Sequence, residues 1–188
     1  STTTTNREDR GDSGVAQKLV DDYNAVRQLY LDGTGKNDLP PFALATLTKD
    51  LPALSLSSSS SLLTDSALFW QTAQMWQTLC YTVREGRQMR LSVDRNEIMI
   101  ASAMKKGGPL KLPVHMEDLG PADRRQLEEM EVEAQREWVA LGLDPCLDFQ
   151  VLLTLREAED RVAFLARMIH RERLRLEEIA REPEEKAE

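Results

Sequence analysis

The C-terminal part of the chain carries one long apolar stripe with helical spacing. It consists of Leu147, Val151, Leu155, Ala158, Val162, Leu165, Ile169, Leu176 and Ile179. Steps of three and four residues place such side chains on one face of an α-helix. Asp144-Pro145 precedes the stripe, in the order favoured at a helix start, with a cap residue followed by a first-turn proline. We therefore predict one amphipathic helix from Pro145 to Arg181, with Glu172 interrupting its stripe.

The expected length of this helix limits how the rest of the chain can cover it. At 1.5 Å per residue the helix would extend about 55 Å, which is about twice the diameter of a compact domain. Part of it should therefore project from the chain or lie along a partner. Residues 183–188 follow it as an acidic tail.

The N-terminal part predicts a leader and a helical segment. Residues 1–14 are almost free of apolar side chains, and we expect them to be a disordered leader. Residues 15–52 form an N-terminal helical segment, with Ser13 as the expected N-cap, Gly33 and Gly35 as the end of its first helix, and a short second helix over residues 42–51. The stripe of the first helix is Leu19, Val20, Tyr23, Val26 and Tyr30.

Residues 53–63 include Ser57 to Ser61 and predict a flexible linker. Thr64 or Asp65 can cap the next helix, which we expect to continue past Gly86 to Met104. Its core face holds Phe69, Trp76, Cys80 and Val83, and its later stripe Leu91, Ile98 and Ala101.

The segment from Lys106 to Pro109 should end that helix, and residues 110–119 should form an extended, ordered crossing segment. Pro121 starts another helix, whose stripe is Leu127, Met130, Ala134, Trp138 and Leu141, with Gly142 as its cap. The fold class is therefore all-α: a helical bundle over residues 64–182, with a long C-terminal amphipathic helix and ordered loop insertions.

Composition restricts the partners and the compartment. The net charge is −8, from 32 acidic and 24 basic residues, which argues against nucleic acid as the main partner. No stretch approaches the about 20 apolar residues of a transmembrane helix, so we expect a soluble protein. The two cysteines form no C-x-x-C pair, which favours a reducing intracellular compartment. The chain begins without methionine, so an organelle (chloroplast or mitochondrion) entered after removal of a leader is a candidate.

Patterns of catalytic or metal-binding chemistry are weak. The two histidines, His115 and His170, stand near no cysteine in sequence, so we predict no metal site, and we expect His170 to be solvated. Cys146 follows a first-turn proline, where the helix dipole would lower the pKa of an exposed thiol, although a buried structural role is favoured. Lys105 to Gly108 could cradle an anion, but a solvated helix end is the preferred interpretation. We predict no catalytic residue and no cofactor.

Segments of the last helix resemble the N-terminal (substrate-binding) domain of Lon proteases. The similar residues are Phe149 to Leu153, Glu159 to Val162, Leu165 and Glu172 to Leu176, and an earlier segment, Val20 to Leu47, with Tyr23, Pro40, Pro41 and Leu44. The β-rich half of that domain has no equivalent in this chain. The resemblance implies a stand-alone helical subdomain used for protein binding, without ATPase motifs or the catalytic Ser–Lys pair, and it carries over no functional residue.

These observations favour a non-catalytic protein-binding or scaffolding subunit of a larger intracellular assembly, whose partners are other protein subunits. Amphipathic helices bind by laying apolar anchors into grooves. The candidate contacts are Trp70, Leu155, Val162, Leu165, Ile169, Leu176 and Ile179. Two alternatives remain open, namely a homodimeric helical adaptor related to the Lon domain, which would pair through the same helix, and a thiol-dependent enzyme that uses Cys146.

Overall fold

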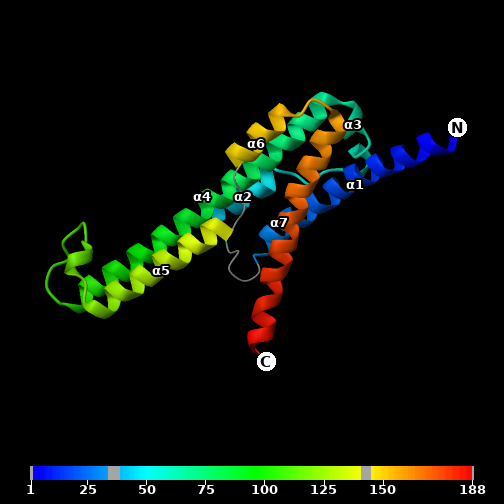
Figure 1. Cartoon of the computed structure of the whole chain (residues 1–188). Helices are drawn as coiled ribbons and strands as arrows, with labels where there is room; N and C mark the ends of the chain where they lie inside the picture. Colours follow the sequence, from blue (N-terminus) through cyan, green and yellow to red (C-terminus); the bar gives the residue numbers. More distant parts are fainter. Residues whose placement is uncertain (1, 34–38, 141–144, 188) are drawn as a thin grey trace. The chain divides into compact units, whose positions relative to one another are not determined.

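The computed structural model describes residues 2–33, 39–140 and 145–187, and all regular structure in these ranges is helical (Figure 1). The all-α prediction is confirmed. The α-helices are α1 (Thr2–Asp32), α2 (Pro41–Lys49), α3 (Ser61–Thr64), α4 (Ser66–Lys105), α5 (Pro121–Ala140), α6 (Pro145–Thr154) and α7 (Ala158–Ala187), with 3-10 turns η2 (Leu56–Ser58) and η3 (Met116–Asp118).

The chain divides into two compact units, and α4 passes from the first to the second at Glu85–Gly86. The first unit contains α1, α2, α3, the first part of α4, α6 and α7. The second unit contains the rest of α4, the loop after it and α5. This division differs from the predicted N-terminal segment (15–52) and bundle (64–182), because α1 packs along α7 instead of forming a separate segment.

The core of the first unit is built from the apolar stripes of α1, α4 and α7. The α1 stripe and the face of α4 with Phe69, Trp76, Cys80 and Val83 are buried, as predicted. The rings of Tyr23 and Trp76 meet edge to face, with centroids 6.4 Å apart. The apolar side chains of each stripe are removed from water because the stripe packs on the stripe of another helix. This burial is the main source of stability for amphipathic helices.

The two ends of the chain are more helical than expected. Helix α1 begins at Thr2, so the predicted disordered leader (1–14) is wrong for residues 2–14, and Ser13 lies inside the helix and is not its N-cap. Residues 2–14 contain no proline, and extending an existing helix adds one hydrogen bond for each residue fixed. Helix α7 likewise continues to Ala187, through most of the predicted acidic tail (183–188).

The serine-rich segment is folded, which corrects the prediction of a flexible linker over residues 53–63. It contains η2 and leads into α3, and α3 contacts both α1 and α7. The hydroxyl of Ser58 donates to the carbonyl oxygen of Ser55 at 2.6 Å, and Leu62 is buried. Local bonds of this kind and one buried leucine hold the segment on the first unit.

The predicted continuous helix from Pro145 to Arg181 is broken between α6 and α7, and the chain changes direction there (Figure 1). The guanidinium of Arg161 explains how the break is tolerated. Its Nη1 donates to the carbonyl oxygens of Leu155 at 3.2 Å and Arg156 at 2.9 Å. These bonds satisfy carbonyl groups that follow the end of α6 and would otherwise lack helical partners.

Local start and stop signals are confirmed for α4 and α5. Oδ1 of Asp65 accepts from two backbone N–H groups of the first turn of α4, at 3.1 and 3.2 Å. Gly107 and Gly108 have φ values of +74° and +88° and end that helix. Pro121 is the first residue of α5. The predicted cap at Gly142 lies outside the described residues.

Within the second unit, α5 packs on one face of α4. Arg95 Nη1 lies 2.8 Å from Glu131 Oε1, and the Ser102 hydroxyl donates to Asp123 Oδ2 at 2.6 Å. The loop between the helices is not the extended crossing segment predicted for residues 110–119. It contains η3 and is held by Arg124, whose Nε donates to the carbonyl oxygen of Met116 at 3.3 Å.

Candidate interaction surface

Most of the predicted partner-binding stripe on α7 is used inside the chain. Val162, Leu165, Ile169 and Leu176 are buried in the first unit, whose α7 packs mainly on α1. Leu155 and Ile179 are half-buried. The four buried residues are therefore core residues and are not open contacts, because the stripe of α1 already covers that face of α7.

Trp70 is half-buried on α4 and packs against aromatic and cationic neighbours. Its ring lies edge to face against Phe69 and Phe149, with centroid distances of 5.3 and 6.0 Å. The guanidinium carbon of Arg161 is 5.7 Å from the centroid of the same ring. Trp70 therefore contributes to the packing of α6 and α7 on α4, and only part of its surface is available to a partner.

The buried carboxylate of Asp22 on α1 is held by two side chains of α7. Arg173 Nη1 donates to its Oδ1 at 2.8 Å, and His170 Nδ1 lies 3.0 Å from its Oδ2. His170 was expected to be solvated; it is instead half-buried against this carboxylate. Hydrogen bonds to Glu177 and Asp22 raise the pKa of Arg173, so its charge persists and compensates the burial of Asp22.

A second buried acid explains the interruption of the α7 stripe. Glu172 is buried, and its Oε1 accepts from the hydroxyl of Tyr30 at 2.8 Å. Arg175 donates to both carboxylate oxygens of Glu172, through Nη2 to Oε1 and through Nε to Oε2. Glu172 therefore faces α1 together with the apolar residues of α7, and its charge is compensated on the same helix.

Cys80 and Tyr23 lie in the core as neutral groups. Burial raises the pKa of the Cys80 thiol well above its usual value, which disfavours the nucleophilic thiolate. Burial also raises the pKa of Tyr23 to about 12, and its hydroxyl has no hydrogen-bond partner within the described part of the chain.

The side chains of Cys146 and Trp138 lie outside what the structure describes, so the proposed role of Cys146 stays a prediction.

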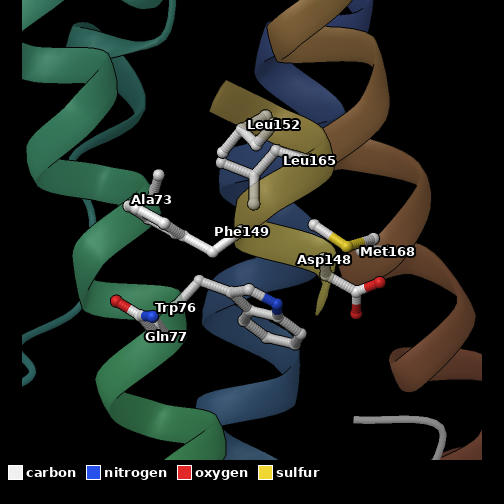
Figure 2. A pocket seen from close by; sticks show the side chains of 8 residues that line it. All are labelled: Ala73, Trp76, Gln77, Asp148, Phe149, Leu152, Leu165 and Met168. Carbon is white, nitrogen blue, oxygen red and sulfur yellow. The ribbon is translucent and has the colours of Figure 1, made fainter. Parts of the chain in front are cut away.

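A small cavity opens where α4, α6 and α7 meet, and Figure 2 shows the side chains around it. Trp76 and Ala73 reach it from α4, Phe149 and Leu152 from α6, and Leu165 from α7. Its volume is about 10 Å³, which is room for about one water molecule. The cavity is a packing gap and is too small for an organic ligand.

The second unit has a cavity of about 60 Å³ between α4 and α5, lined in part by Leu91, Arg95 and Leu127. This volume also lies far below the roughly 300–1,000 Å³ of ligand pockets.

Among the described side chains, no group of three or more His, Cys, Asp and Glu residues could hold a metal ion. None of the described helices is both long and apolar enough to cross a bilayer.

Four exposed apolar side chains share one face of the second half of α4, which we call the α4 stripe. It consists of Met89, Val93, Ile100 and Met104, whose exposed fractions are 56%, 52%, 38% and 67%. Their spacing of four, seven and four residues confines them to an arc of about 60° on a helix with 3.6 residues per turn. The four side chains therefore share one side of α4, with the exposed polar side chain of Asn96 between Val93 and Ile100.

The α4 stripe lies on the opposite side of α4 from α5. Arg95 and Ser102, which bond to α5, stand about 180° around the helix from the stripe. The sequence contained this signal, but the predicted stripe of Leu91, Ile98 and Ala101 assigned α4 a single apolar face. Ala101 is exposed in the structure. Two apolar faces on one helix predict two neighbours, and α5 is only one of them.

The loop that follows α4 adds further exposed apolar side chains, Leu110 and Leu112. Lys106 was considered as part of an anion cradle from Lys105 to Gly108. Its Nζ instead donates to the backbone carbonyl oxygen of Asp118 within the loop, so this ammonium group helps to hold the loop.

Comparisons with known proteins give no family assignment, and the resemblance to the Lon substrate-binding domain therefore stays a prediction. No protein-family model, no curated protein and no solved structure matches this chain.

Proposed function

We propose that this chain is a non-catalytic protein-binding subunit of a larger intracellular assembly and that it binds through the α4 stripe. The observation that carries the proposal is the exposure of Met89, Val93, Ile100 and Met104 on one helical face. Exposed apolar side chains grouped on one face are typical of sites of protein interaction.

The chemistry of the stripe fits helix-in-groove or helix-on-helix recognition. Its four side chains follow the helical repeat that places anchors on one face. Two of them are methionines, whose flexible thioethers adapt to an apolar partner surface. Covering the stripe would remove apolar area from water at about 25 cal/mol per Å², which provides the driving force for binding.

Other features support the non-catalytic part of the proposal. The thiol of Cys80 is buried and its pKa is raised, which keeps it protonated. The cavities of about 10 and 60 Å³ are too small for an organic substrate. The resemblance to a domain that binds protein substrates points in the same direction.

The test is a charge introduced on the stripe, with a matched control on the same helix. Val93→Asp combined with Ile100→Asp places two carboxylates on the α4 stripe. Gln88→Asp combined with Ala101→Asp places two carboxylates on exposed positions away from it. Far-UV circular dichroism of each purified variant verifies that the helices are retained.

The tagged full chain is then expressed in its native cells, and the extract is separated by size exclusion. We expect the wild-type chain and the control to elute in an assembly larger than the 21.3 kDa chain, and the stripe variant to elute outside that assembly. A folded stripe variant that stays in the assembly together with the control would show that the α4 stripe is not the binding surface.

A further inference from the structure

We infer that the α4 stripe pairs with the α4 stripe of a second copy of this chain, as a parallel two-stranded coiled coil. The inference rests on the proposed function, because it names the partner of the same surface. It is argued from the order of residues along the stripe, from the charges beside it and from the position of α5.

Residues along the exposed face follow the spacing of a coiled-coil seam. Met89, Val93, Asn96, Ile100 and Ala103 are separated by steps of four, three, four and three residues. These steps alternate the two core positions of a heptad, with Val93 and Ile100 at position a and the other three at position d. β-Branched residues at a, with leucine at d, favour the parallel two-stranded form. The α4 stripe matches that arrangement at position a only.

Exposed charges beside the seam favour the parallel orientation. In a parallel pair, Glu85 of one copy faces Arg90 of the other, and this attractive contact occurs twice by symmetry. Glu97 then faces the hydroxyl of Ser92. An antiparallel pair centred on Asn96 would instead bring the two Glu97 carboxylates together, and like charges at such positions are destabilising. All four of these residues are exposed in the single chain.

The remaining side chains in and beside the seam also find matching side chains on the second copy. Met99 of one copy meets Met104 of the other, and this contact covers the most exposed member of the stripe. Asn96, which is exposed in the single chain, meets its own copy, so that each amide can bond to the other. A buried polar amide without a partner costs stability, and the in-register pair is the arrangement that brings the two Asn96 amides together.

The position of α5 leaves room within the second unit for such a pair. Arg95 and Ser102 bind α5 from the side of α4 opposite the seam. The seam from Met89 to Ala103 is only about 21 Å long, so the interface falls at the small end of specific interfaces. We therefore expect a dissociation constant on the order of micromolar.

The first experiment measures the mass of the purified full chain by light scattering at concentrations from about 1 to 200 µM, around the expected dissociation constant. We expect the mass to rise from 21.3 kDa toward twice that value. Val93→Asp with Ile100→Asp should remain a single chain at every concentration. Gln88→Asp with Ala101→Asp should behave as the wild type.

The second experiment tests orientation with single added cysteines in a Cys146→Ser background, where the remaining Cys80 is buried. Asn96→Cys at a seam position should form a disulfide-linked dimer under mild oxidation, because each residue 96 faces its own copy. Ala101→Cys on the same helix lies away from the seam, and we expect at least about tenfold less linked dimer.

The two failures can be told apart. A chain that stays at 21.3 kDa at every concentration overturns the pairing with a second copy, while the assembly in native extract still tests the proposed function. A dimer that survives the stripe substitutions, or one in which Asn96→Cys links no better than Ala101→Cys, also overturns the inference.

Discussion

Two buried tyrosines on α1 offer a matched test of what hydroxyl groups contribute in the core of the first unit. Tyr23 and Tyr30 are both fully buried, and they lie seven residues apart in the same helix. The same change, tyrosine to phenylalanine, removes one hydroxyl from each. The two hydroxyl groups differ in their partners, so we expect the two variants to shift stability in opposite directions.

Tyr30→Phe should destabilise the chain. Its hydroxyl donates to Glu172 Oε1 at 2.8 Å and accepts from Arg175 Nη2 at 3.3 Å. A hydrogen bond to a charged group contributes about 1.5–3 kcal/mol. Arg175 continues to bind the carboxylate of Glu172 after the change, so the acid keeps a partner. We therefore expect the free energy of unfolding to fall by about 2 kcal/mol.

Tyr23→Phe should stabilise the chain. Burying an unpaired polar group costs about 1–3 kcal/mol, and the hydroxyl of Tyr23 has no partner among the described residues. The ring keeps its edge contact with Trp76. A small gap at the former hydroxyl offsets part of the gain, so we expect the free energy of unfolding to rise by about 1 kcal/mol.

Urea unfolding measures this difference of about 3 kcal/mol. Tryptophan fluorescence and far-UV circular dichroism should give coincident transitions, which justifies a two-state analysis. With an m-value of about 2 kcal/mol per M, the midpoints of the two variants should differ by about 1.5 M. Equal shifts in the same direction would refute the reasoning, because the hydroxyl partners would then not determine the cost.

Three further predictions concern helix capping, core packing and alkaline pH. Asp65→Ala removes the N-cap that accepts from two N–H groups of α4, and the free energy of unfolding in urea should fall by about 1 kcal/mol. Ile169→Ala, at a fully buried position of α7, should cost about 2–5 kcal/mol, whereas Leu174→Ala, at an exposed position of the same helix, should change it by under about 0.5 kcal/mol. Burial raises the pKa of Tyr23 from 10.0 to about 12, so the unfolded chain loses this proton first as pH rises. This group does not lower the free energy of unfolding below pH 10. Between about pH 10 and 12 it lowers that free energy by about 1.4 kcal/mol per pH unit. Tyr23→Phe should reduce the slope of the free energy of unfolding against pH by this amount, while the buried Cys80 thiol contributes its own part in both proteins. An unchanged slope would contradict the assignment.

Local signals determined where most helices lie. Asp65, Pro121 and the pair Gly107-Gly108 mark helix ends through bonds and dihedral angles within a few residues, and the structure confirms them. The apolar face of α1 was also readable, because residues three and four apart share a side of any helix. These features depend on near neighbours in the chain, which the sequence displays directly.

The tertiary structure determined which helical faces pack against each other. A stripe shows that a helix has a partner but not whether the partner is another helix of the chain or another protein, so the α7 stripe was assigned to a partner when α1 covers it. The break between α6 and α7 depends on Arg161 reaching back to the carbonyl oxygens of Leu155 and Arg156. Residues distant in sequence, such as Asp22 and His170, meet only after the helices pack.

The α4 stripe combines both kinds of information. Its spacing is written in the sequence, yet apolar spacing is the same for a buried face and an exposed one. Only the packing of α5 on the opposite side of α4 shows that Met89, Val93, Ile100 and Met104 remain in contact with water. Periodicity determines which side chains share a face, whereas burial depends on what lies beyond the helix, and that is a property of the whole fold.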